Sequence, residues 1–92
     1  MEKFFYRVQA GDSVLSVCQR FNCSMGKLIS LNELKTEICA GDVLMVEREK
    51  TIYMVKATDT LEKIAKRFNL SPQCILEKNC VPYIFCGLII SV

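Results

Sequence analysis

Cysteines and carboxylates are the residues of this sequence that could support metal binding or catalysis. The chain has six cysteines and no histidine in 92 residues. It has no CxxC pair, and Cys18 and Cys23 are five positions apart, which matches no common zinc-ligand spacing. A cysteine nucleophile would also lack its usual histidine base. The sequence therefore predicts no metal site, no cofactor and no catalytic residues.

Asp59 and Glu62 form a carboxylate pair with the spacing of a helix capping box. Capping accounts for both residues without catalysis, so we expect no enzyme activity in this chain. Asp12 and Asp59 are expected to be turn and cap residues, with Ser13 as an alternative cap. Any ligand contact beside them would then be made mainly by adjacent backbone.

A twelve-residue segment occurs twice and organises the chain. Residues 10–21 read AGDSVLSVCQRF, and residues 57–68 read ATDTLEKIAKRF. Both copies place apolar residues at i, i+3, i+4 and i+7, which is one face of a helix. We expect Arg20 and Arg67 to lie on the solvated faces of these helices.

Other elements flank each of these helices. Alternating strands are predicted at residues 5–9 and 52–56, and residues 43–46 and 88–92 read as closing strands. Second helices are predicted from Ser24 and Ser71, and Asn32 and Asn79 are expected to end them, because asparagine tolerates the left-handed conformation.

The fold class predicted from this order is α+β. It consists of two tandem small βααβ modules, each with a two-stranded antiparallel sheet packed on two helices. Residues 4–47 are assigned to the first module, 48–51 to the linker and 52–92 to the second module. The linker region, residues 47–51, spans at most ~18 Å when extended, so the modules must be neighbours.

Bulk composition limits the kind of partner. Apolar residues make up 51% of the chain, and the net charge is only +2. A net charge of this size is too small for a typical nucleic-acid-binding protein, which carries a clear excess of positive charge. The longest uncharged run, residues 81–92, is shorter than the ~20 residues of a membrane span. Arg7 ends the apolar start of the chain before a secretory signal could form. We expect synthesis in the cytoplasm and no nucleic-acid or membrane partner.

The cysteines do not follow the repeat, which argues against a disulfide framework. Cys18 aligns with Ala65 and Cys23 with Leu70, so these two cysteines replace small or apolar core residues. Buried free thiols are therefore the expectation. A disulfide between Cys80 and Cys86 stays open as an alternative.

The ordered positions of both copies resemble the LysM (lysin motif) family. The first copy contributes Tyr6-x-Val8-x-Ala10-Gly11-Asp12-Ser13-Val14, Val17-Cys18-x-Arg20-Phe21, Leu28, Asn32 and Ile38-x-x-Gly41-x-x-Leu44-x-Val46. The second contributes Tyr53-x-Val55, Asp59-Thr60-Leu61, Ile64-Ala65-x-Arg67-Phe68, Asn79 and Ile84-x-x-Gly87. The resemblance covers nearly the whole chain.

The resemblance implies binding of glycans that contain N-acetylglucosamine, with peptidoglycan as the first choice and chitin as the second. In the family the sugar lies in a shallow groove between the turn after the first strand and the loop before the last strand. Carried over by position, the first groove uses Gly11, Asp12, Ser13, Val14, Leu34, Lys35, Thr36, Glu37 and Ile38. The second groove uses Thr58, Asp59, Thr60, Leu61, Val81, Pro82, Tyr83 and Ile84.

We therefore expect a non-catalytic carbohydrate-binding protein associated with the cell wall or spore envelope. Two features favour an alternative role in protein interaction, self-association or assembly. Thr58 stands where the family has glycine, and the apolar tail of residues 81–92 could leave an exposed patch. A third alternative is the targeting part of a peptidoglycan hydrolase.

Overall fold

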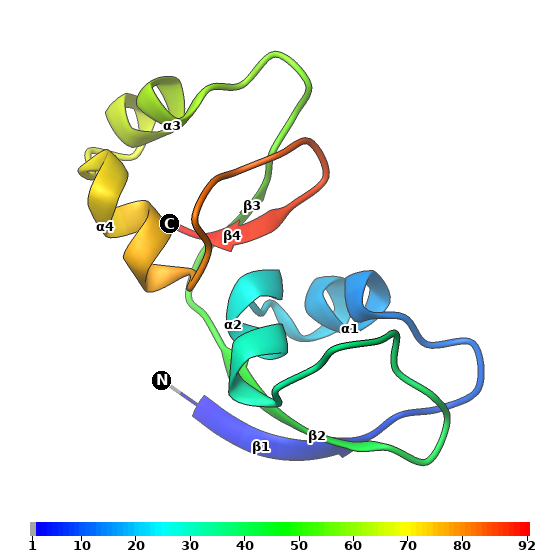
Figure 1. The fold of residues 1–92 in the computed structure, drawn as a ribbon. Coiled ribbons are helices and arrows are strands. Elements are labelled where there is room, and N and C mark those ends of the chain that lie inside the picture. Colours follow the sequence, from blue (N-terminus) through cyan, green and yellow to red (C-terminus); the bar gives the residue numbers. More distant parts are fainter. Residues whose placement is uncertain (1) are drawn as a thin grey trace.

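The computed structural model describes residues 2–92 and shows two copies of one βααβ arrangement (Figure 1). The predicted α+β class and the predicted order of elements are confirmed. The elements are β1 (Glu2–Arg7), α1 (Val14–Phe21), α2 (Met25–Leu31), β2 (Val43–Arg48), β3 (Ile52–Met54), α3 (Leu61–Arg67), α4 (Pro72–Lys78) and β4 (Ile89–Ser91).

Each copy has its own two-stranded antiparallel sheet. β1 pairs with β2 with Tyr6 opposite Leu44, and β3 pairs with β4 with Tyr53 opposite Ile90. Alternation along the strands turns one face of each sheet towards the helices. The second sheet is the shorter, with three residues in each strand against six in the first.

All four helices in residues 2–92 begin at a hydroxyl cap, as their sequences favour. The Ser13 side chain accepts a hydrogen bond from the Ser16 amide, and Thr60 does the same for Lys63. The expected capping box of Asp59 with Glu62 is therefore wrong, because Thr60 is the cap of α3. The aspartates before these caps are free to make other contacts.

Asn32 and Asn79 end α2 and α4 as expected. The expectation that they do so in the left-handed conformation is wrong. Asn32 has a φ of −103°, and the left-handed conformation falls on the next residue, Glu33, with a φ of 51°. The Asn32 side chain instead joins helix to strand. It donates to the carbonyl oxygens of Leu28 and Met45, both at 2.9 Å, and accepts from the Met45 amide at 2.7 Å.

Each copy has a hydrophobic core of its own. The larger side chains of the first include Val17, Leu28, Leu44 and Val46, with Cys18 and Cys23 buried among them as expected. The second is built on Val55, Ile64, Ala65, Ile75, Leu88 and Ile90. All six cysteine thiols are free.

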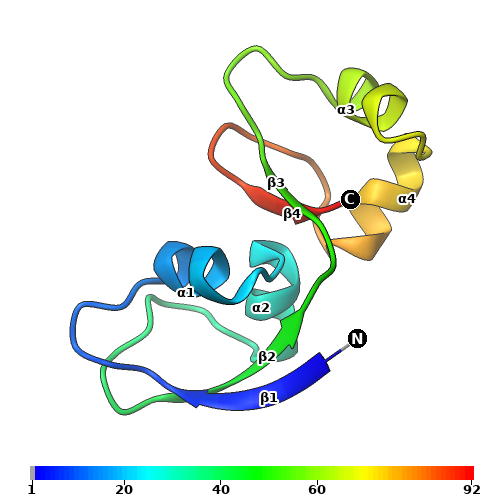
Figure 2. The same cartoon turned by 180° about the vertical axis from the view of Figure 1, so that it is seen from behind.

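The two copies also pack against each other. Helices α1 and α2 lie between the two sheets, and both contact β4 of the second copy (Figures 1 and 2). Ile89 of β4 is buried in the first core, and Met25 packs against both cores. The Ser24 hydroxyl donates to Asn79 Oδ1 at 2.6 Å, and both residues are fully buried.

Within residues 2–92, no helix has the length and apolar character needed to cross a membrane. In the same part of the chain, no three cysteine, aspartate or glutamate side chains come together as a metal-binding group.

Candidate functional site

The turn after β1 is held by a cluster of Tyr6, Asp12 and Arg20. Asp12 Oδ2 accepts hydrogen bonds from the Tyr6 hydroxyl and from the Gln9 amide, the latter at 2.9 Å. Arg20 donates to the Tyr6 hydroxyl at 2.8 Å and to Asp12 Oδ1 at 3.1 Å. Arg20 is exposed, as expected for a solvated helix face, but its guanidinium also joins α1 to the strand and the turn.

The second copy repeats this cluster with Tyr53, Asp59 and Arg67. Asp59 Oδ2 accepts from the Tyr53 hydroxyl and from the Lys56 amide, and Arg67 donates to the Tyr53 hydroxyl at 3.0 Å. In each copy the tyrosine hydrogen bond, followed by the backbone amide, holds the pKa of the aspartate below its usual range. Both carboxylates therefore serve to position the turn.

The two turns differ in backbone conformation. Gly11 has a φ of 89°, whereas Thr58, its counterpart, is not among the residues with positive φ in the described chain. Both turns still close with a backbone hydrogen bond, from Asp12 to Gln9 at 3.1 Å and from Asp59 to Lys56 at 3.0 Å. Thr58 thus avoids the strain of a left-handed conformation by forming a different turn.

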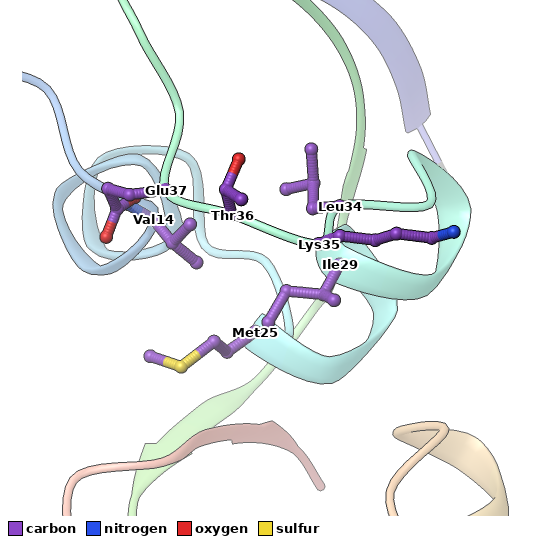
Figure 3. A pocket seen from close by; sticks show the side chains of 7 residues that line it. All are labelled: Val14, Met25, Ile29, Leu34, Lys35, Thr36 and Glu37. Atoms are coloured by element: carbon purple, nitrogen blue, oxygen red, sulfur yellow. The ribbon is translucent and has the colours of Figure 1, made fainter.

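An open groove of about 390 Å³ lies beside the first turn (Figure 3). Its lining includes five of the predicted site residues: Val14, Leu34, Lys35, Thr36 and Glu37. Gly11, Asp12 and Ser13 belong to the turn that precedes the groove but do not line it, and Ile38 is buried in the first core.

Met25 and Ile29 of α2 also line this groove, and sequence reasoning did not select them. They are four positions apart and so lie on one face of the helix. Figure 3 shows the Ile29 side chain directed towards the loop that carries Leu34 and Lys35, while the Met25 side chain extends sideways on the side of Val14. The signal that could have found them is this spacing of two apolar side chains on one face of α2.

The groove combines an apolar surface with a few polar groups. Val14, Met25, Ile29 and Leu34 supply the apolar part, and Lys35, Thr36 and Glu37 supply the polar part. Glu37 lies at the end formed by α1, where its Oε1 accepts from the Val14 amide at 3.2 Å. Such a surface suits a ligand with both apolar and hydrogen-bonding faces.

The second copy has a hollow of about 370 Å³, lined by Gln73, Leu76, Glu77, Cys80, Val81 and Pro82. Two of the predicted residues, Val81 and Pro82, line it. The structure does not bring Thr58, Asp59, Thr60 or Leu61 to this hollow, and Ile84 packs against the second core.

Tyr83 lies on the same loop and does not line the hollow, and its side chain is 65% exposed. Its ring centroid is 6.2 Å from that of Phe85, which is also exposed and which sequence reasoning did not select. The second copy therefore presents an aromatic pair where the first presents a groove wall.

The fold and the open grooves define a class of small α+β binding modules, present here as a tandem pair. The chain belongs to the LysM domain family, whose family model matches residues 6–46 and 53–82. LysM domains are binding modules for glycans that contain N-acetylglucosamine, such as peptidoglycan, and they are not themselves catalytic.

Two solved structures are similar to this chain. The Bacillus cereus spore cortex-lytic enzyme SleL is 21% identical, with a TM-score of 0.50 over 100% of this chain and 22% of that chain. The SleL of Bacillus megaterium QM B1551 is 32% identical, with a TM-score of 0.47 over 96% of this chain and 22% of that chain. The chain thus spans 22% of the length of each. No curated protein matches it.

Proposed function

We propose that the chain is a non-catalytic binder of glycans that contain N-acetylglucosamine, with peptidoglycan as the preferred polymer and chitin as the second. The observation that carries this proposal is the groove of the first copy, which lies between the start of α1 and the loop of residues 34–37. We assign residues 4–47 and 52–92 to the two modules and 48–51 to the linker.

The chemistry of the groove fits this sugar. N-acetylglucosamine has an acetamide, several hydroxyls and an apolar ring face. Val14, Ile29 and Leu34 can cover the acetamide methyl group and the ring. Backbone amides at the start of α1 and in the loop can donate to the acetamide carbonyl.

The two modules contribute unequally in this proposal. The groove of module 1 includes residues from both predicted walls, whereas the hollow of module 2 lacks its turn residues. The loop of module 2 also exposes Tyr83 and Phe85. We propose that module 1 is the main site and that module 2 adds a weaker contact on the same polymer. Two tethered sites raise the overall affinity through effective concentration.

The same proposal places the protein at the cell wall or the spore envelope, because peptidoglycan is the structural polymer of both. The two similar Bacillus structures are those of spore cortex-lytic enzymes. A related alternative is that this chain is the targeting part of a peptidoglycan hydrolase, holding a separate catalytic domain on its polymer.

Sedimentation with insoluble peptidoglycan and with chitin tests the proposal. We expect the protein to pellet with peptidoglycan, and Ile29→Asp, which places a charge in the groove, to remain largely in the supernatant. Leu15→Asp is the matched control, because Leu15 is 41% exposed against 38% for Ile29 but lies outside the groove. Wild-type protein that stays in solution with both polymers would refute the proposal.

Protein interaction or self-association is a second candidate function, and the first sheet favours it. Phe5 and Val43 on its outer face are 71% and 54% exposed. Their counterparts in the second sheet, Ile52 and Ile89, pack against the core of module 1. The apolar tail of residues 81–92 is divided: residues 88–91 are buried, whereas Tyr83 and Phe85 are 65% and 50% exposed and form a small aromatic patch.

Light scattering over a range of concentrations tests this second candidate. We expect the apparent mass to rise with concentration in the wild type and to stay at the monomer value in Phe5→Ser. Leu15→Ser serves as the control, since it removes a similar exposed side chain from α1. A wild-type protein that is monomeric throughout would exclude self-association through this face.

A further inference from the structure

The carboxylate of Glu37 joins the two walls of the module 1 groove. Its Oε1 accepts hydrogen bonds from the Val14 amide at 3.2 Å and from the Ile38 amide at 3.1 Å. Val14 belongs to α1 and Ile38 to the loop before β2, so one side chain links both elements. Figure 3 shows Glu37 beside Val14 at the end of the groove formed by α1.

The Val14 amide has a particular need for an acceptor. Val14 is the first residue of α1, and the first amides of a helix have no acceptor within the helix. The positive end of the helix dipole also favours a negative group at this position. The acetamide carbonyl of a bound sugar would be a neutral acceptor for the same amide, so it must compete with the carboxylate.

Module 2 has no carboxylate at the corresponding position. The alignment of Ile38-x-x-Gly41 with Ile84-x-x-Gly87 places Tyr83 opposite Glu37. The Tyr83 side chain is largely exposed and lies against Phe85. The contact between Glu37 and the start of α1 is therefore a property of the first copy.

We propose that Glu37 is an internal competitor for the glycan in module 1, occupying the amide that an acetamide carbonyl would otherwise use. This inference rests on the proposed function. It makes Glu37 a residue that restrains affinity, although it lies within the groove. Removing its carboxylate therefore strengthens binding in module 1.

An NMR titration with chitotetraose, a soluble N-acetylglucosamine tetramer, tests the proposal with wild-type protein and Glu37→Ala. We expect amides that line the module 1 groove to report binding about two- to tenfold tighter in the variant, which corresponds to releasing one hydrogen bond. Glu37→Gln keeps an acceptor oxygen without the charge and should give an intermediate affinity. Amides of module 2 serve as the internal control and should report an unchanged affinity.

The reciprocal experiment places a carboxylate in module 2. Tyr83→Glu should weaken binding reported by module 2 amides more than Tyr83→Ala does, because both variants lose the ring and only the first gains a competitor. Thermal unfolding of every variant verifies that it is folded at the titration temperature. Equal effects of the two Tyr83 variants would count against the proposal.

The outcomes separate this inference from the proposed function. Wild-type protein that binds the tetramer in module 1 as tightly as Glu37→Ala, or more tightly, overturns the role of Glu37 and leaves the proposed function intact. Absence of binding by both proteins overturns the proposed function and this inference together. Binding by Glu37→Ala alone supports the role of Glu37 and counts against glycan binding by the wild-type groove.

Discussion

At the scale of single residues, Tyr6, Asp12 and Arg20 show what a sequence pattern can and cannot reveal. The repeat identifies the aspartate as a turn residue, and the structure agrees. The pattern does not reveal that Arg20, 14 positions from Tyr6, donates to its hydroxyl. That contact depends on how α1 packs over β1, which is a tertiary property.

These clusters predict a loss of stability in acid. The pKa of Asp12 and of Asp59 is lowered in the folded protein relative to the usual value of about 3.9, so folding favours the charged form. The stabilisation that the charged Asp12 and Asp59 give to the folded state is fully present above about pH 4. It is lost as the pH falls through their lowered pKa in the folded protein. We expect the Tm to fall steeply below pH 4.

The double variant Asp12→Asn with Asp59→Asn provides the check. It should have a lower Tm than the wild type at pH 7 and a smaller decrease in Tm from pH 5 to pH 2. Thermal unfolding followed by circular dichroism measures both quantities. An acid dependence equal to that of the wild type would show that other carboxylates cause the transition.

At the scale of elements, helix α2 serves the first core, the groove and the contact between modules. Met25 lines the groove and also packs against both cores. Gly26 lies so close to the second module that a Cβ on it would be 2.1 Å from the Asn79 carbonyl oxygen and 2.6 Å from Val81 Cγ1. Glycine at this position is therefore required for packing.

Gly26→Ala is predicted to destabilise the protein by about 1–3 kcal/mol, the usual cost of overpacking. Alanine normally stabilises a helix relative to glycine by about 1 kcal/mol, so the sign of the change is diagnostic. Gln73→Ala at the corresponding position of α4 is the control, because that residue is exposed. Its effect should stay within about 0.5 kcal/mol. Urea unfolding gives both values, and a stabilised Gly26→Ala would contradict the close contact.

The elements could be predicted because apolar periodicity and caps are local signals. Hydroxyl residues at Ser24 and Ser71 marked the starts of second helices that do begin there. The wall of the groove formed by Ile29 could not be predicted in the same way. An apolar residue on a helix face is normally predicted to belong to the core. Only the arrangement of the loop over α2 shows that Ile29 borders a groove.

At the scale of the whole molecule, the modules share buried groups and should unfold together. Asn79 is the central residue of this contact. It donates to the Ile75 and Ser91 carbonyls at 2.8 and 3.0 Å, and accepts from the Ser91 amide and the Ser24 hydroxyl, both at 2.6 Å. None of the contact between modules was predicted, because Ser24 and Asn79 are 55 positions apart.

Asn79→Ala is predicted to lower the stability of both modules by about 2–4 kcal/mol, since it leaves several buried polar groups without partners. Amide hydrogen exchange in each module measures the effect. Asn32→Ala is the comparison, because Asn32 joins α2 to β2 within module 1 and is only partly buried. Loss of protection in module 2 alone would show that the modules unfold independently.

The glycine in α2 also gives the tandem pair a direction. The contact requires a glycine on the N-terminal unit and an asparagine carbonyl on the C-terminal unit. The C-terminal unit has Gln73 where that glycine would be needed. A third unit appended after it could not dock in the same way, and exchanging the order of the two units would bring a long side chain against a backbone carbonyl. The two halves of the repeat are therefore not interchangeable in this contact.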